Sequence, residues 1–310
     1  MARGMKRDAD PVDGLLLLNK PSGMSSNRAL QLVRRLINAR KAGHTGSLDP
    51  AATGMLPLCF GEATKVCAYM LEADKSYRVT AKLGSTTDTG DGDGQVIETA
   101  DVPELSADEW NEFLQSFCGE STQIPPMYSA LKKDGKRLYE LARKGEVVER
   151  EPRGIRLDKI ELLELAGNRL VFRVSCSKGT YIRVLVEDIA RKAGTIAHTA
   201  RLHRETVGDF ESANMLDMTT LEALAEQGLE QIRAELLPAD VALTDMPAVS
   251  VGSEEAVKFC GGMAVSVAIE EQEGLARVYE AGNRFLGVGE LSGDGLVAPR
   301  RVFLTQEETP

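Results

Sequence analysis

Apolar and polar residues alternate along this chain with the spacings of strands and helices. Residues 15–18 form a short apolar run that predicts a buried strand. In residues 77–83 apolar positions alternate strictly with polar ones, and residues 170–175 alternate in the same way except at Val171, which is typical of strands with one buried face. Helical spacing is found over about 25–38, beginning at a serine cap, and over 182–194, ending at a glycine. The pattern predicts interspersed strands and helices.

The chain divides into a main part and a small C-terminal part. Residues 211–246 contain acidic helical stretches, and after Pro247 the pattern changes to short apolar strands separated by glycine turns. We therefore expect a flexible tail over residues 1–12, a main domain over residues 13–246 and a small β domain over residues 249–310. The strands expected in the small domain span residues 264–269, 275–279, 285–291 and 296–304.

Composition is that of a soluble globular protein. Hydrophobic residues make up 43% and charged residues 27% of the 310 positions. No apolar run reaches the roughly 18 residues of a membrane helix, and the N-terminus lacks the apolar core of a secretory signal. The five cysteines are scattered without a Cys-x-x-Cys pair, which argues against a disulfide framework or a zinc site. We expect a cytoplasmic protein.

The net charge of −10 argues against a nucleic-acid partner, but the charges are unevenly distributed. Residues 205–246 contain ten acids and one base, and so account for −9 of the total. Residues 132–156 contain nine bases and five acids. Because a positive face can coexist with an acidic flank, the total charge does not exclude RNA.

Residues 43–57 contain three glycines and two prolines, which predicts an irregular loop in place of a helix or strand. This loop carries His44, one of three histidines, and one acid, Asp49. An Asp-Pro pair of this kind most often makes local hydrogen bonds in a turn. Taken alone, the residues favour this structural role for Asp49 over a chemical one.

The order Gly-His-Thr-Gly, Leu-Asp-Pro and Thr-Gly-Met-Leu-Pro in residues 43–57 resembles the catalytic loop of the TruB family of tRNA pseudouridine synthases. The resemblance covers almost the whole chain and implies that Asp49 is the essential catalytic group. It implies an α+β fold, with a mixed, largely antiparallel sheet and flanking helices. The small β domain resembles the PUA-like RNA-binding domain of bacterial members. His44 is then expected to fill the space that a flipped base vacates.

Three further motifs of the family assign roles around Asp49. Tyr77, in a Lys-x-Tyr-x-Val run, is expected to stack on the target base, although such a tyrosine is also common core filling. Arg183 lies near a helix start, where a cation opposes the helix dipole, and the family makes it the partner of Asp49. We expect this pairing to lower the Asp49 pKa. Leu202 is expected to line the base pocket, and His203 stands where the family usually has arginine.

The remaining predicted substrate contacts are Lys20, Tyr181 and Lys132. Lys20 opens a Lys-Pro-Ser-Gly-Met-Ser-Ser run that resembles the family's N-terminal motif. The residues alone favour a structural corner between a strand and a helix, without chemistry for the Lys20 charge. Lys132 follows two prolines in residues 123–153, where basic residues are mixed with tyrosines. In the family this region is a mobile insertion, the thumb, that closes on RNA.

The acidic run of residues 88–94 does not form a calcium site. An EF-hand loop with Gly94 at its sixth position needs acids where the chain has Thr89 and Ala100. The run also lacks a dinucleotide-binding glycine pattern. We therefore expect no metal and no cofactor. A contact between Asp91 and substrate is left open.

The resemblance implies the isomerisation of uridine-55 in the T loop of tRNA, by base flipping and an aspartate-dependent rearrangement. The partner is the tRNA T arm, without a membrane or an obligatory protein partner, and a monomer is expected. Two other functions are considered. One is an RNA-binding or RNA-folding protein in which catalysis is secondary. The other is a glycoside hydrolase that uses Asp49 with a second carboxylate, for which no second acid in the matched motifs is suited.

Overall fold

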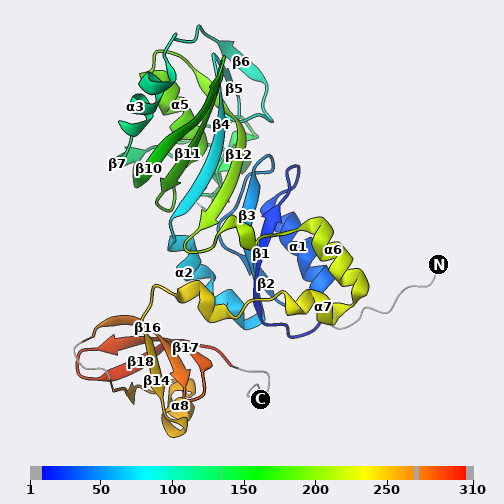
Figure 1. The fold of residues 1–310 in the computed structure, drawn as a ribbon, viewed down its shortest axis with the longest axis vertical. Coiled ribbons are helices and arrows are strands. Elements are labelled where there is room, and N and C mark those ends of the chain that lie inside the picture. Colours follow the sequence, from blue (N-terminus) through cyan, green and yellow to red (C-terminus); the bar gives the residue numbers. More distant parts are fainter. Residues whose placement is uncertain (1–8, 134, 269–271, 305–310) are drawn as a thin grey trace, which may run out of the picture.

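The computed structural model describes residues 9–133, 135–268 and 272–304, and its main part is built on one large sheet (Figure 1). The strand order is β13-β1-β3-β12-β4-β11-β10-β7, with β2 added to β3. The pairs β1–β13 and β3–β12 are parallel and the other pairs are antiparallel. The predicted mixed, largely antiparallel sheet is therefore confirmed. Its strands are β1 (Gly14–Lys20), β2 (Ala42–His44), β3 (Thr53–Phe60), β4 (Lys75–Leu83), β7 (Gly119–Gln123), β10 (Arg153–Ala166), β11 (Arg169–Cys176), β12 (Ala197–Val207) and β13 (Leu216–Asp217).

Helices cover the two halves of this sheet separately (Figure 1). One hydrophobic core joins α3 and α5 to β4, β10 and β11, and a second joins α1, α6 and α7 to β1 and β3. A third core lies under α2 and includes Val288 and Phe303 from the C-terminal part, so that part packs directly on the main one. The helices are α1 (Ser26–Ile37), α2 (Cys67–Glu72), α3 (Ala107–Gln115), α5 (Ile182–Lys192), α6 (Met218–Gln227) and α7 (Leu229–Ala234).

The C-terminal part has its own sheet and its own core. The strand order is β14-β16-β17-β18-β15, and one helix, α8 (Ser253–Cys260), packs against it. Neither α8 nor β14 is predicted from the sequence, and Ile269, the last residue of one predicted strand, lies outside the described residues. The strands are β14 (Ala248–Val251), β15 (Val265–Ser266), β16 (Gly274–Glu280), β17 (Arg284–Ser292) and β18 (Leu296–Val302).

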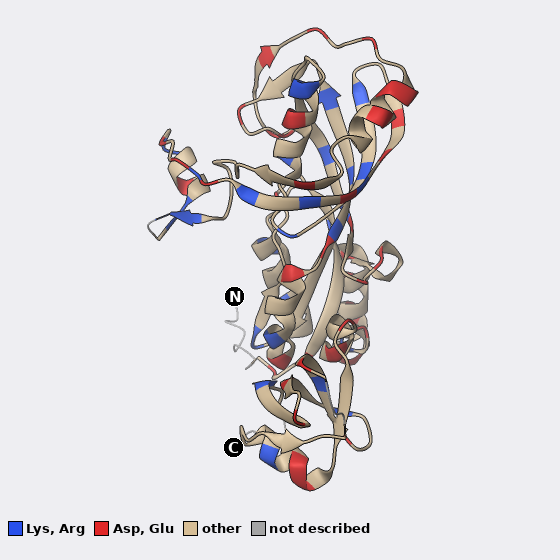
Figure 2. Ribbon diagram, turned by 90° about the vertical axis from the view of Figure 1, so that its left-hand side faces the viewer, with Lys and Arg blue, Asp and Glu red and all other residues tan. Residues whose placement is uncertain are grey.

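Two small hairpins extend from the main sheet. The first, β5 (Ser85–Thr87) and β6 (Val96–Thr99), encloses the acidic connection of residues 88–94. The second, β8 (Lys132–Lys133) and β9 (Lys136–Arg137), is followed by α4 (Leu138–Ala142). Residues 123–153 are called the insertion below. The second hairpin and α4 form its outer part, which projects from the body of the molecule (Figure 2).

Two predictions about the chain's course are wrong. Residues 9–12 are not a frayed tail, because Val12 is buried and the Asp10 backbone pairs with that of residues 38–40, while the rest of the predicted tail lies outside the described residues. Residues 43–57 are not one irregular loop, because β2 and β3 take up both of its ends. Pro57 is tolerated inside β3 at the point where this strand passes from its pairing with β12 to its pairing with β2.

Gly54 allows β3 and β12 to approach each other closely. Its φ is +100°, and a Cβ at this position would lie 2.3 Å from the carbonyl oxygen of Arg204. Arg204 is the cross-strand partner of Gly54 in the parallel pairing of the two strands. A side chain at residue 54 would therefore push β12 away from β3 and from the loop that precedes β3.

Gly54→Ala is expected to lower the free energy of unfolding by about 2 kcal/mol or more, since it combines a strained φ with a backbone clash. Urea unfolding of the purified protein measures the change. Gly154→Ala in β10 is the matched control, because nothing lies within 4 Å of the added Cβ. Equal unfolding midpoints for the two variants would contradict the packing described here.

Candidate active site

The loop of residues 45–52, called the Asp49 loop, is held by the turn that follows β1. The Ser26 hydroxyl accepts a hydrogen bond from the Leu48 amide (2.8 Å) and donates one to the Leu48 carbonyl (3.1 Å). The Ser22 hydroxyl donates to the Ala51 carbonyl (3.1 Å). The Lys-Pro-Ser-Gly-Met-Ser-Ser run therefore acts as a clamp on the Asp49 loop.

Lys20 belongs to the same clamp and does not reach the surface. Its side chain is fully buried, and the ammonium donates to the carbonyls of Pro21 (2.8 Å), Met24 (2.8 Å) and Pro50 (3.3 Å). Burial lowers the pKa of this lysine to about 8. Lys20 is therefore not placed to make the substrate contact that the sequence analysis predicts. Its role is structural, because it fixes the backbone beside Asp49.

Asp49 and Arg183 meet, although 134 positions separate them in the sequence. The Nε atom of Arg183 lies 3.0 Å from an Asp49 carboxylate oxygen. The remaining guanidinium nitrogens donate to the carbonyls of Thr89 (2.8 Å) and Tyr128 (2.7 Å). Arg183, near the start of α5, is buried, whereas 43% of the Asp49 side chain is exposed. One guanidinium thus joins the Asp49 loop, the acidic connection and the insertion.

The sequence analysis predicts that the pairing with Arg183 lowers the Asp49 pKa. This prediction is wrong, because the Asp49 pKa lies above its ordinary value. Partial burial raises the Asp49 pKa, and the Arg183 charge opposes this rise without cancelling it. The nearby Asp91 carboxylate adds to the rise. The guanidinium therefore supports the ionised form of Asp49 against the effect of burial.

Asp91 is a second carboxylate near the Arg183 guanidinium, 3.9 Å from the same Nε atom. An Asp91 carboxylate oxygen accepts hydrogen bonds from the Thr89 hydroxyl (2.6 Å) and from the Asp93 amide (3.1 Å). Asp91 is thus part of the fold of its own connection as well as a second negative neighbour of Arg183.

A cleft of about 320 Å³ opens above Asp49, and Tyr77, Tyr181 and Leu202 line it. This volume is at the lower end of the range found for small-molecule sites. Asp49 is the only carboxylate among the described residues that line the cleft, whereas Lys75, Arg183 and Arg204 supply positive charge. The cleft therefore combines one acid with surroundings that attract anions.

Tyr77 and Leu202 lie on adjacent strands, β4 and β12, and Tyr77 is almost completely buried. Burial raises the pKa of the Tyr77 phenol, which keeps it protonated at neutral pH. Tyr181 lies at the N-cap of α5. The buried Gln123 side chain accepts a hydrogen bond from the Tyr181 amide (2.8 Å) and donates one to its carbonyl (3.1 Å). Both tyrosines are thereby held at the cleft.

His44 and Lys132 are not among the residues that line this cleft. His44 ends β2, and burial together with the Arg204 charge lowers the pKa of its imidazole, which is therefore neutral at pH 7. Its Nδ1 atom is buried and has no hydrogen-bond partner among the described residues. Lys132 is exposed on the β8–β9 hairpin of the insertion, where basic residues gather (Figure 2).

Arg204 and Gln123 are site residues that the sequence does not reveal. Arg204 is buried, and its guanidinium donates to the carbonyls of Met55 (2.7 Å) and Gly46 (3.0 Å). It therefore fixes both flanks of the Asp49 loop to β12. The neighbouring His203 lies 2.9 Å from the Thr53 hydroxyl. Arg204 lies directly opposite Tyr77 in the pairing of β12 with β4. A buried arginine in a strand has no local sequence signal that separates it from a surface cation.

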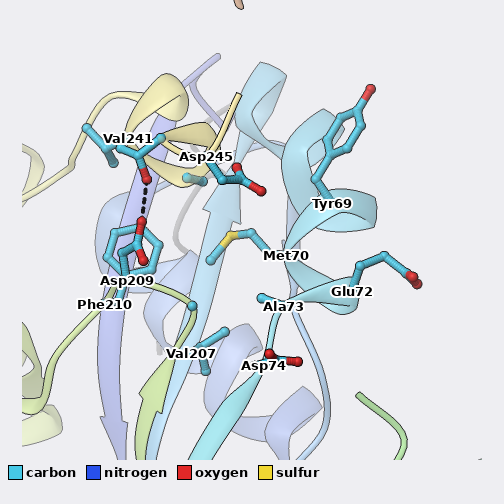
Figure 3. Close-up of a pocket in the computed structure, with 13 residues that line it drawn as sticks. Tyr69, Met70, Glu72, Ala73, Asp74, Val207, Asp209, Phe210, Val241 and Asp245 are labelled. Carbon is cyan, nitrogen blue, oxygen red and sulfur yellow. Dashed lines mark hydrogen bonds between the residues drawn. The ribbon is translucent and has the colours of Figure 1, made fainter. Parts of the chain in front are cut away.

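A different cavity, of about 450 Å³, lies between α2 and the loop after β12 (Figure 3). Among the side chains around it are four carboxylates, those of Glu72, Asp74, Asp209 and Asp245. Such a lining repels phosphate groups, so this cavity is unsuited to RNA. No cluster of residues suited to hold a metal ion is found in the part of the chain that the structure describes.

No helix among the described residues is long and apolar enough to cross a membrane.

The fold is that of pseudouridine synthases. A solved structure described as a Cbf5-Nop10-Gar1 complex superposes with a TM-score of 0.74 at 25% identity, over 95% of this chain and 86% of that chain. A second, described as an H/ACA RNP bound to a substrate RNA containing 2'-deoxyuridine, has a TM-score of 0.72 at 23% identity, over 96% of this chain and 87% of that chain. At this identity the second comparison concerns the fold alone.

Comparison of sequences gives a closer placement. The model of the TruB family pseudouridylate synthase N-terminal domain matches residues 34–182, and models of TruB C-terminal domains match residues 183–244 and 247–303. A tRNA pseudouridine synthase B of Nitrosococcus oceani is 48% identical over 99% of both chains. One of Ectopseudomonas mendocina is 50% identical over 97% of this chain and 98% of its own. The chain belongs to the TruB family of pseudouridylate synthases.

Proposed function

We propose that this protein converts uridine-55 in the T loop of tRNA to pseudouridine. The observation that carries the proposal is the Asp49 carboxylate, paired with Arg183 at 3.0 Å in a cleft between Tyr77 and Leu202. The reaction breaks a C–N glycosidic bond, turns the base and rejoins it through C5. It is redox-neutral, and an ionised carboxylate serves as its nucleophile or base.

The target uridine has to leave its stack before it can reach Asp49, at a cost of a few kcal/mol. In the proposed complex Tyr77 stacks on the uracil and Leu202 packs on its other face. Tyr77 is also the candidate for removal of the proton from C5, a step for which its phenol first has to be deprotonated, because burial keeps it protonated in the free protein. Tyr181 contacts the nucleotide from the start of α5. The neutral imidazole of His44 fills the space that the base leaves.

RNA binding outside the cleft is proposed for two regions. The insertion presents Lys132 and its basic neighbours on a projecting hairpin, where they contact phosphates (Figure 2). Residues 249–310 are proposed as a PUA-like RNA-binding domain, beside a catalytic domain over residues 13–246. We propose that the enzyme acts as a monomer in the cytoplasm, without a metal, a cofactor or an obligatory protein partner.

Incubation with an unmodified tRNA transcript, followed by mapping of pseudouridine at single-nucleotide resolution, tests the proposal. We expect the product at position 55 and none in a transcript that carries cytidine there. Pseudouridine at another position, or tight binding without any product, would overturn the assignment of the target. The second result would favour a protein whose role is to bind or fold RNA.

A further inference from the structure

Two cysteines from separate elements, Cys59 and Cys67, lie next to each other beside β2. Gly43 of β2 is the cross-strand partner of Cys59 of β3, and Cys67 begins α2. The Cys67 sulfur lies 3.4 Å from the point that a Cβ on Gly43 would occupy. In an antiparallel pair, directly opposed Cβ positions are about 4.5–5.5 Å apart on the same face of the sheet. The absence of a side chain at Gly43 thus brings the Cys67 sulfur beside the Cys59 side chain.

The two thiols are chemically unequal. The neighbouring Cys59 thiol, together with the Lys41 charge, lowers the pKa of Cys67. The same contact and burial raise the pKa of Cys59. Cys59 is completely buried, whereas Cys67 is partly exposed. A partly exposed thiol with a lowered pKa beside a second thiol is the arrangement found in oxidation-sensitive pairs.

We propose that Cys59 and Cys67 form an oxidation site, at which a small peroxide converts the two thiols reversibly into a disulfide. The Cys67 sulfur attacks the peroxide, forming an S–O bond while the O–O bond breaks and water leaves. The resulting sulfenic acid is attacked by the Cys59 sulfur, forming the S–S bond while the S–O bond breaks and a second water leaves. Two thiols and one hydrogen peroxide thus give one disulfide and two waters.

The disulfide ties α2 to β3, and it does so close to the Asp49 loop. Leu58, the neighbour of Cys59, pairs with His44, and the other end of β3 continues into the loop. The bridge closes the short segment of residues 59–67, which is a 3-10 turn over Gly61–Val66 in the structure. Reduction by a small dithiol reverses the change by thiol–disulfide exchange.

Two other cysteines provide internal comparisons. Cys118 is exposed, and it tests whether exposure alone determines oxidation. Cys176 is buried against β4, and burial raises its pKa to about 11, which disfavours the thiolate. A disulfide that is selective for Cys59 and Cys67 therefore reports the pairing of these two thiols.

The test exposes the reduced full-length protein to a small molar excess of hydrogen peroxide and maps its peptides by mass spectrometry without reduction. We expect a Cys59–Cys67 cross-linked peptide that has lost two hydrogen atoms, and a thiol count that falls from five to three and returns with dithiothreitol. In Cys67→Ser the cross-link should vanish, and in Cys118→Ser it should be unchanged.

Cys59→Ala provides an independent measurement, because it leaves Cys67 without its partner. We expect Cys67 in this variant to stop at the sulfenic acid, which a dimedone probe labels. Because Cys59 is buried, circular dichroism checks that the Cys59→Ala variant is folded. Cys67→Ser removes the other thiol of the pair at a half-buried position, where the substitution disturbs the fold less. Oxidation of Cys118 before Cys67, or over-oxidation of Cys67 with Cys59 still reduced in the wild type, would overturn the proposal.

Discussion

Asp49→Asn is expected to lower the single-turnover rate of pseudouridine formation by at least about 10⁴-fold, because an amide can act neither as nucleophile nor as base. tRNA affinity should not fall, since the substitution removes a negative charge from a cleft that otherwise carries positive side chains. Release of tritium from C5 of labelled uridine measures the rate, and filter binding measures the affinity.

Asp93→Asn is the matched control for this change, because Asp93 is an exposed acid in the connection that carries Asp91, and its backbone amide, which the substitution keeps, makes the bond to Asp91. We expect this variant to retain the wild-type rate. An Asp49→Asn protein that keeps its rate within about tenfold of the wild type would show that the carboxylate is not the catalytic group.

Arg183→Lys is expected to reduce the rate by about 10²–10³-fold, although the positive charge is kept. One ammonium cannot reproduce a guanidinium that joins the Asp49 carboxylate to the carbonyls of Thr89 and Tyr128. Loss of these contacts is expected to lower the free energy of unfolding by about 2 kcal/mol. The rate is therefore measured at a temperature at which urea titration shows the variant to be folded.

The pH dependence separates this effect from a general loss of structure. Arg183 opposes the burial that raises the Asp49 pKa, so a weaker partner raises that pKa further. A smaller fraction of Asp49 is then ionised at neutral pH, and the acid limb of the pH–rate profile moves to higher pH. Arg191→Lys, an exposed change on the same helix, should leave the limb in place. An unshifted limb in Arg183→Lys would contradict the pairing.

Much of the fold could be predicted where the information is local. The helix α1 begins at a serine cap and ends at Asn38, whose φ is +59°, as its turn signals indicate. The alternation in residues 77–83 and, apart from Val171, in residues 170–175 corresponds to β4 and β11. In residues 77–83 the period is unbroken and one face is buried, which are the conditions under which a sequence pattern is most informative.

The longest strand, β10, could not be predicted because its alternation is interrupted. Register shifts occur between Leu157 and Lys159 and again between Leu162 and Glu164. Each bulge moves the buried positions by one residue, so no single period runs through residues 153–166.

Only the site residues that belong to sequence motifs could be predicted. Asp49, Tyr77 and Leu202 are brought together at one cleft, and their roles there remain proposals. The contacts that position them could not be predicted, because they join distant segments through burial. Arg204 reaches Gly46 across 158 positions, and Lys20, which looks like a surface cation, has its ammonium enclosed by backbone carbonyls.

The parallel pairing of β1 with β13 bears on how the chain matures during translation. The Asn19–Asp217 contact at this edge spans 198 positions, and Leu15 is bonded through both backbone groups to Leu237. The strand β3 is made soon after β1 and pairs with one of its edges. At about 5–20 residues per second, the partners of the other edge, β13 and Leu237, are made only roughly 10–40 s after the leucine-rich first strand. A nascent chain therefore carries an unpaired hydrophobic edge for most of its synthesis, which makes it a natural client for chaperones that bind near the exit tunnel.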